Sequence, residues 1–142
     1  MEYRRIDVSQ LGQLWELQIA YKAEIGEETP AAQDRSRLES AMEHGQIIFF
    51  GAWDGQTLAG CCSVTVGFST FLYTPSGVLE DFYIRPPYRH RGIARELVRF
   101  AFSDCGAAAL TVGCADCDVS MYRTLGFSVK LGNLLAFETD AV

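Results

Sequence analysis

Hydrophobic positions recur with two different periods along the chain, and the period changes from segment to segment. Alternation from Tyr3 to Val8 predicts a first strand, after which Ser9 stands in the position of a helix N-cap. That helix is expected to end near Gly26, and a second helix is expected from about Gln33 to Glu43, with Gly45 ending it. The apolar side chains expected near one face are Leu11, Leu14, Trp15 and Tyr21 in the first helix, and Leu38, Ala41 and Met42 in the second.

A strand hairpin is the clearest feature of the middle of the chain. The stretch 46–68 predicts two antiparallel strands around Asp54-Gly55, a pair typical of tight hairpin turns. The elements expected after it are a strand over 77–84, a helix over 92–103, a strand over 107–114, a helix over 118–125 that Gly126 closes, and a last strand region over 127–138. This order favours an α/β sandwich of helices around a mixed sheet.

The composition limits the class of protein. A chain of 142 residues fits one domain, expected here to span 1–142, and buries about 70% of its unfolded surface on folding. Hydrophobic residues make up 49% and the mean hydropathy is near zero, as in globular proteins. No apolar stretch reaches the roughly 20 residues of a membrane helix, and the first residues lack the apolar core of a signal peptide. We therefore expect a soluble, cytoplasmic protein that does not bind a membrane.

The charge balance and the cysteines limit the partner, the compartment and the metal that can be expected. Acidic residues outnumber basic ones by 18 to 12, which argues against nucleic acid as the main partner. The five cysteines are an odd number, and Cys61 and Cys62 are adjacent in an apolar strand pattern, which indicates a reducing compartment. Cys114 and Cys117 have C-x-x-C spacing, but no second such pair or His pair completes a zinc site, so no metal is expected.

A local cluster of positive charge interrupts this acidic chain between a predicted strand and a predicted helix. The amide groups of a helix N-terminus attract anions, and Gly92 and Ala94 let a ligand approach the backbone closely. Arg89, Arg91 and Arg95 surround that turn with fixed charge. Positive side chains there cost about 0.3–1 kcal/mol, which argues against a merely solvated helix start. A diphosphate site is favoured, although neither a Walker loop nor a G-x-G-x-x-G fingerprint is present.

The residues around this cluster resemble a known family. EDFYIRPPYRHRGIA, from Glu80 to Ala94, resembles the coenzyme A motif of the GNAT superfamily of N-acetyltransferases, whose core is Q/R-x-x-G-x-G/A. MYRTLGF, from Met121 to Phe127, resembles the second family motif, a Tyr followed by a Gly-Phe pair. The resemblance implies an acyltransferase of class EC 2.3.1 with acetyl-CoA as co-substrate and no metal. It also implies a three-layer sandwich in which helices flank a mixed, mostly antiparallel central sheet.

The same resemblance implies roles for individual positions. The strand before the loop would bind the pantetheine arm with Phe82, Tyr83 and Ile84. The residues that would hold the pyrophosphate are Arg89, His90, Arg91, Gly92, Ile93 and Ala94, with Arg95 beside them. The chain departs from the family at Ala115, where many members carry an Asn seven residues before the Tyr. The residues left open as its replacement are Asp116, Asp118 and Ser120.

Acetyl transfer to an amine needs a proton acceptor and a proton donor. An alkylamine with a pKa of about 10.4 costs roughly 4.6 kcal/mol to neutralise at pH 7. Glu80 and Asp81 are candidate bases, and strand alternation predicts that only one of them points into the cleft. The resemblance favours Glu80 as the base, while the alternative that both carboxylates merely hydrogen-bond to neighbouring segments stays open. The resemblance makes Tyr122 the donor to the leaving thiolate, against the alternative of a core tyrosine.

A covalent route through Cys114 is disfavoured. A cysteine nucleophile needs a base nearby, and the two histidines, His44 and His90, are poorly placed along the sequence. Direct transfer to the acceptor is therefore expected. A backbone N–H near residues 82–84 is the expected group to polarise the acetyl carbonyl.

The acceptor is the least determined part of the prediction. Glu24, Glu27 and Glu28 in the connection between the first two helices would attract a cationic amine, or they simply form a solvated loop. The aromatic residues Phe68, Phe71 and Tyr73 either wall the acceptor pocket or form an edge for a second subunit in a homodimer. Three functions stay open: acetylation of a small-molecule amine, acetylation of a protein N-terminus or Lys, and non-catalytic binding of acyl-CoA.

Overall fold

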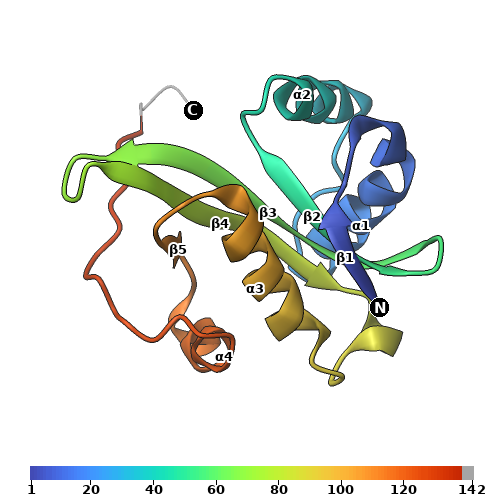
Figure 1. Cartoon of the computed structure of the whole chain (residues 1–142). Helices are drawn as coiled ribbons and strands as arrows, with labels where there is room; N and C mark the ends of the chain where they lie inside the picture. Colours follow the sequence, from blue (N-terminus) through green and yellow to red (C-terminus); the bar gives the residue numbers. More distant parts are fainter. Residues whose placement is uncertain (139–142) are drawn as a thin grey trace.

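A computed structural model describes residues 1–138, so the predicted domain end at Val142 lies outside the described residues. Within that range five strands form one sheet in the order β1-β2-β3-β4-β5, in which all neighbours are antiparallel except the parallel pair β4 and β5 (Figure 1). The strands are β1 Glu2–Arg5, β2 Ile48–Asp54, β3 Thr57–Ser69, β4 Thr74–Ile84 and β5 Leu110–Val112. The α-helices are α1 Leu11–Glu24, α2 Ala32–Glu43, α3 Ile93–Cys105 and α4 Val119–Thr124.

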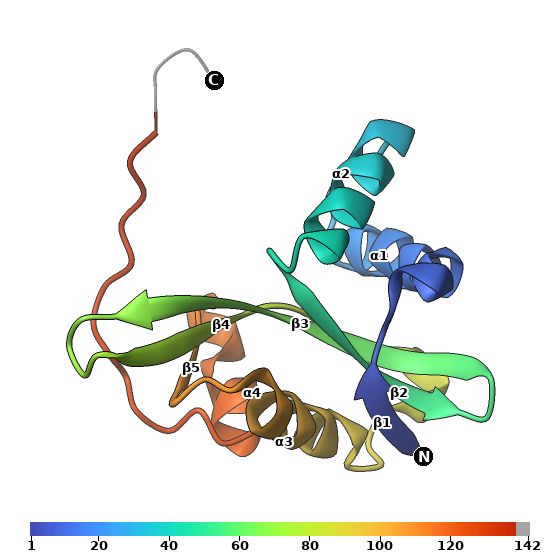
Figure 2. The same cartoon turned by 45° about the horizontal axis from the view of Figure 1, so that its top comes forward.

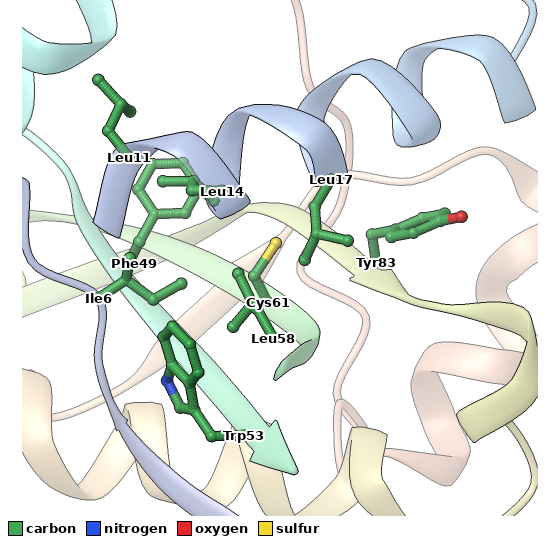
Figure 3. Packing of buried hydrophobic residues seen from close by; sticks show 9 residues of the cluster. All are labelled: Ile6, Leu11, Leu14, Leu17, Phe49, Trp53, Leu58, Cys61 and Tyr83. Atoms are coloured by element: carbon green, nitrogen blue, oxygen red, sulfur yellow. The ribbon is translucent and has the colours of Figure 1, made fainter. Parts of the chain in front are cut away.

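Helices cover both faces of the sheet. Helices α1 and α2 pack on one face and α3 and α4 on the other, which confirms the three-layer α/β architecture (Figures 1 and 2). One apolar cluster joins α1 to the sheet through Leu14, Leu17 and Phe49 (Figure 3). A second joins α3 to the opposite face, with Leu97 and Phe50 fully buried. Each such side chain contributes about 1.5–3 kcal/mol by burial, so the two clusters fix the helices against the sheet.

The first helix begins differently from the sequence prediction. The strand ends at Arg5, and Asp7 is the N-cap of a 3₁₀ turn over Val8–Gln10, accepting a hydrogen bond from the Ser9 N–H at 2.6 Å. The prediction that Ser9 caps the helix is therefore wrong. Asp7 takes the role because its side chain reaches the amide two residues on, and α1 continues from the 3₁₀ turn.

The predicted hairpin around Asp54-Gly55 is confirmed as the β2–β3 turn. A second, longer hairpin joins β3 to β4. Its pairing continues to Ser69 and Thr74, and its end extends past the helices as the hairpin tip, defined here as residues 66–78 (Figure 1). Most of the large apolar side chains that are exposed in the β3–β4 hairpin lie in this tip.

The last predicted strand is absent. Residues 127–138, called the C-terminal arm below, follow α4 without any strand assignment, and they extend from the body without joining the sheet (Figures 1 and 2). The alternating pattern of the arm gives it strand character, but a strand also needs an edge to pair with. The edge strand of the sheet beside the arm, β5, has only three residues, and within residues 1–138 the arm does not pair with its outer edge.

The described part of the chain, residues 1–138, has no helix that is long and apolar enough to cross a membrane.

Candidate active site

A β-bulge in β4 determines where the two predicted carboxylates lie. In the β3–β4 ladder Cys62 is opposite Phe82, whereas Val64 is opposite Leu79. One residue of β3, Ser63, therefore faces two residues of β4, Glu80 and Asp81. An extra residue on one strand interrupts the alternation of side chains between the two faces.

The bulge places Glu80 and Asp81 on the same face of the sheet. The Ser63 hydroxyl donates to Asp81 Oδ2 at 2.8 Å and accepts the Asp81 N–H at 3.0 Å. The Thr65 hydroxyl donates to Glu80 Oε1 at 2.9 Å. Ser63 and Thr65 are two apart on β3, so they point to one side. The expectation that only one of the two carboxylates could point into the cleft is therefore wrong, because it assumed regular alternation.

The two carboxylates differ in their surroundings. Glu80 is exposed, whereas Asp81 is half-buried. Burial raises the pKa of Asp81, and the Glu80 charge adds to the rise, while the Ser63 hydrogen bond and Lys22 oppose it. The site thus combines one solvent-facing carboxylate with one that is costly to ionise.

The edge of β4 beside these residues has no partner strand within residues 1–138. Strand β5 pairs only with Gly77–Leu79, so β4 continues unpaired on that side from Glu80 to Ile84. The side chains of Tyr83 and Ile84 are buried in the two apolar clusters on opposite faces of the sheet. The predicted pantetheine-binding residues therefore offer a free backbone edge, while the side chains of Tyr83 and Ile84 belong to the core.

The turn before α3 has the features of an anion site. Gly92 is the N-cap of α3 in the left-handed region, with φ +79°, and makes no side-chain cap. The first intrahelical bond in this turn is donated by Glu96 N–H to the Gly92 carbonyl, so the amides of residues 93–95 have no helical acceptor. A Cβ at Gly92 would meet nothing within 4 Å. These amides, beside the open space at the Gly92 Cβ position, fit a diphosphate group.

The arginines of the cluster divide into two kinds. Arg89 donates from Nε to the Ile84 carbonyl at 2.8 Å and pairs with Glu24 at 2.7 Å. Its side chain therefore fastens the loop to the end of α1. Arg91 and Arg95 are exposed, and no carboxylate in residues 1–138 pairs with either of them. Their charges are available to an anion, whereas the charge of Arg89 is already matched.

Tyr122 lies on α4 with its ring edge-on to Phe127, 5.9 Å between centroids. Burial raises the pKa of Tyr122 to about 12, and nearby Tyr21 and Asp118 add to the rise. Tyr21, which the sequence predicts only as part of the apolar face of α1, packs edge-on against Tyr83, with 6.3 Å between ring centroids. Its pKa is also raised, by burial first and by the Asp81 charge second. The sequence feature that could have identified Tyr21 as a site residue is its hydroxyl group, which lies at the end of an otherwise apolar helix face.

The remaining predicted positions are spread around this centre. Cys61 and Cys62 are buried, and burial raises the pKa of both thiols, whereas Cys114 is exposed. Ala115 begins a 3₁₀ turn without a side-chain cap, and Asp118 makes no cap bond to α4. The positions left open to replace the family Asn, namely Asp116, Asp118 and Ser120, are all exposed. The described residues contain no group of three or more metal-ligating side chains.

The three acidic residues predicted between α1 and α2 do not all line one pocket. Glu24 pairs with Arg89, and Glu27 pairs with Lys22 at 2.9 Å. Glu27 and Glu28 both line a cavity of about 770 Å³ beside α1 and α2, whereas Glu24 does not line it.

A second cavity, of about 580 Å³, lies on the β3–β4 hairpin and is called the hairpin trough below. It begins at Thr65, the residue that holds Glu80, and Phe68 and Phe71 contribute to its wall. Tyr73 does not line it but contacts Phe68 edge-on. Glu80 itself does not line the trough, and the hydrogen bond from Thr65 is what connects its carboxylate to this cavity.

Comparisons with known proteins agree with this geometry. A model of the acetyltransferase (GNAT) family matches residues 12–127, while no curated protein matches the chain. A solved probable acetyltransferase is 21% identical, with a TM-score of 0.86 over 99% of each chain. An aminoglycoside acetyltransferase from an uncultured soil metagenomic sample, solved with sisomicin, is 14% identical, with a TM-score of 0.82 over 97% of this chain and 95% of that one.

A third solved structure is similar over a comparable length. The ribosomal-protein-alanine N-acetyltransferase from Brucella melitensis biovar Abortus 2308 is 12% identical, with a TM-score of 0.77 over 97% of this chain and 100% of that one. Sequence identities this low show only a shared fold. The family model covers most of the chain and therefore shows the family. The chain therefore belongs to the acetyltransferase (GNAT) family and is an N-acetyltransferase.

Proposed function

We propose that this chain transfers the acetyl group of acetyl-CoA directly to a primary amine of a small cationic molecule. The observation that carries this proposal is the Glu80 carboxylate, which Thr65 holds at the start of the hairpin trough. Asp81 lies on the same face, so an approaching cation meets two acidic groups. The similarity in fold to an aminoglycoside acetyltransferase supports an acceptor with several amines.

Acetyl-CoA supplies the activated acetyl group and a thiolate that can leave. The amides of residues 93–95, with Arg91 and Arg95, would hold its diphosphate. The unpaired edge of β4 from Glu80 to Ile84 would bind the pantetheine arm by backbone hydrogen bonds. A backbone N–H of the same edge would polarise the acetyl carbonyl.

Glu80 would act as the general base for the acceptor amine. It is exposed, so the amine can reach it directly or through one water, and Thr65 fixes its orientation. Asp81 is tied to Ser63 by two hydrogen bonds and is less accessible. We therefore assign to Asp81 the positioning of the bulge and the attraction of the cation.

Tyr122 would stabilise the leaving thiolate. Its pKa of about 12 keeps the hydroxyl protonated at neutral pH, so it can donate a hydrogen bond. A thiol has a pKa of roughly 8.5, so complete transfer of the phenolic proton would cost about 5 kcal/mol. Tyr122 would thus act through a hydrogen bond to the sulfur, with the proton that neutralises the thiolate finally coming from solvent or the acceptor.

A screen of amines with acetyl-CoA, monitored by release of free thiol, tests this assignment. With the best acceptor, Glu80→Gln and Tyr122→Phe should each lower kcat about 100-fold or more, the usual contribution of a positioned acid or base. Asp81→Asn is the matched control, and it should raise the acceptor KM with a smaller loss in kcat. If both Glu80→Gln and Tyr122→Phe keep full kcat, the assigned roles are wrong.

A protein N-terminus is the second candidate acceptor. The trough is lined mainly by exposed residues of the hairpin tip, so an extended peptide can enter it from the side. One of the solved proteins with a similar fold is a ribosomal-protein-alanine N-acetyltransferase. Short peptides with a free N-terminal amine belong in the same screen. A kcat/KM for them far above that of every small amine would make the protein acceptor the better assignment.

A further inference from the structure

The cavity beside α1 and α2 has no part in the proposed transfer reaction. It has a volume of about 770 Å³, and neither Glu80, Asp81 nor Tyr122 lines it. Its wall, called the α1–α2 groove below, consists of one side of α1, the connection between the two helices and the first turns of α2. Helices α1 and α2 cover the same face of the sheet (Figure 2). The α1–α2 groove is therefore a cavity with no assigned ligand.

Gln18 is a buried polar side chain whose amide is not used by the protein. Only 8% of Gln18 is exposed, and its side chain makes no hydrogen bond with any group in residues 1–138. Gln13, on the same helix, uses both ends of its amide. Its Nε2 donates to the Gln56 carbonyl at 2.9 Å, and its Oε1 accepts the Leu58 N–H at 2.9 Å. Because buried amides are normally satisfied in this way, the unused amide of Gln18 indicates a partner that binds beside it.

The amide of Gln18 opens into the α1–α2 groove. Gln18 lines this cavity, and its amide atoms are not fully enclosed, since Trp53 Nε1 is the one fully enclosed side-chain atom without a partner in residues 1–138. Trp15 and Lys22 are three residues before and four residues after Gln18, so all three share one side of α1. All three line the cavity. A ligand in the groove can thus hydrogen-bond to Gln18 while it lies against the Trp15 ring.

The charged side chains of the groove leave one carboxylate unmatched. Lys22 pairs with Glu27 at 2.9 Å, and Arg37 pairs with Asp34 at 3.9 Å. Glu28 is the third carboxylate of the wall, and it forms no ion pair within residues 1–138. The wall therefore has a net negative charge and attracts a cation.

The chemistry of the wall fits a guanidinium cation. The face of an indole ring attracts a cation, and no Arg or Lys of residues 1–138 stacks on Trp15, which is half-buried. The amide oxygen of Gln18 and the carboxylate of Glu28 both accept N–H groups. A guanidinium group is planar and has five N–H donors, so it can stack on the ring and donate to both oxygens at once.

We propose that the α1–α2 groove is a second ligand site, which binds a small guanidinium compound with its cation between the Trp15 ring, the Gln18 amide oxygen and the Glu28 carboxylate. This site is separate from the acceptor site proposed at Glu80 and Asp81, and it does not depend on which amine the enzyme acetylates.

The fluorescence of Trp15, with n-butylguanidinium as the probe, tests the site. The chain has two tryptophans, and Trp53 is only 2% exposed, so quenching by the probe reports on Trp15. The titration uses the double variant Glu80→Gln/Asp81→Asn, which lacks the carboxylates of the acceptor site. At low salt the change should saturate with a Kd of about 1 mM or lower, and calorimetry should give one probe per chain. Butyrate has a similar alkyl chain and the opposite charge, and it should not bind.

Single substitutions in the same background then locate the cation. Glu28→Gln should raise the Kd about 10-fold through the loss of a charge-assisted hydrogen bond, and its melting temperature should not change because Glu28 is exposed. Glu43→Gln is the matched control. It removes the same charge from an exposed position of α2 that does not line the groove, so it should change the Kd less than about twofold. Gln18→Met keeps the length of the side chain without its amide and should raise the Kd about fivefold.

Tetramethylammonium separates hydrogen bonding from charge alone. It carries the same charge as the probe but has no N–H donor, so it should bind at least about 10-fold more weakly. A fluorescence change that does not saturate by about 10 mM probe would overturn the site. So would equal effects of Glu28→Gln and Glu43→Gln, equal binding of butyrate, or a site that is present in wild type and lost in the Glu80→Gln/Asp81→Asn background.

Discussion

The pKa of Asp81 reflects the local environment of its carboxylate. The fold partly buries its carboxylate next to Glu80 and Tyr21, and the resulting rise in pKa means that ionising Asp81 works against folding. In the unfolded chain the same group titrates near 3.8. Between that value and the raised value the folded state binds more protons than the unfolded state, so the stability contributed by Asp81 decreases as the pH rises.

Substitution of Asp81 by Asn should therefore stabilise the protein relative to wild type in a pH-dependent way. The difference in melting temperature should be smallest near pH 4 and should increase toward neutral pH, where Asp81 is ionised. Thermal denaturation from pH 4 to pH 8 measures it. Ser63→Ala removes a hydrogen bond that favours the ionised form, so in that background the Asn substitution should have a steeper dependence. A difference that stays constant with pH, or that decreases as pH rises, would contradict the assignment.

At the scale of elements, the proposed binding role of the α3 N-terminus can be distinguished from its contribution to the stability of the helix. Gly92 and Gly106 flank α3, both in the left-handed region, with φ +79° and +77°, and both have open space at the Cβ position. Alanine at either position should cost roughly 1–2 kcal/mol of stability through backbone strain. Only the methyl group at Gly92 lies where the diphosphate is proposed to bind.

We expect Gly92→Ala to raise the KM for acetyl-CoA about 10-fold or more, which corresponds to the loss of one charge-assisted hydrogen bond. Gly106→Ala should leave that KM unchanged while lowering the melting temperature by a similar amount. Steady-state kinetics at saturating acceptor, together with thermal denaturation, distinguish the two variants. Equal effects on KM would mean that the turn before α3 does not bind the diphosphate.

Elements also show which parts of the fold the sequence could predict. Helices α1 to α4 and the Asp54-Gly55 turn follow from local periodicity and turn chemistry, and they lie close to their predicted positions. The β4 bulge was not predictable, because it depends on the pairing of β4 with Ser63 on another strand. The Arg89–Glu24 pair joins residues 65 apart in the sequence, so no local pattern indicates it. The arm has a strand pattern, but the pattern does not reveal whether a partner edge is present in the same molecule.

At the scale of the whole molecule, charge is distributed unevenly around the proposed reaction. Net charge is −6, yet Arg91 and Arg95 stand exposed at the α3 N-terminus, while Glu80 and Asp81 lie on β4. An anionic cofactor is repelled by the whole molecule and attracted by this small region. The Debye length is about 10 Å at 0.1 M salt, so near that ionic strength the local arginines should outweigh distant acidic groups.

Two double variants with the same net charge separate these contributions. Arg91→Ala/Arg95→Ala should raise the KM for acetyl-CoA about 10-fold at low salt and remove most of its salt dependence, because the nearby charges are gone. Arg35→Ala/Arg37→Ala removes two charges from α2, on the other face of the sheet, and should change that KM by less than about twofold. Kinetics over a range of ionic strengths measure both. Equal effects of the two pairs would show that net charge, and not the α3 N-terminus, governs the capture of acetyl-CoA.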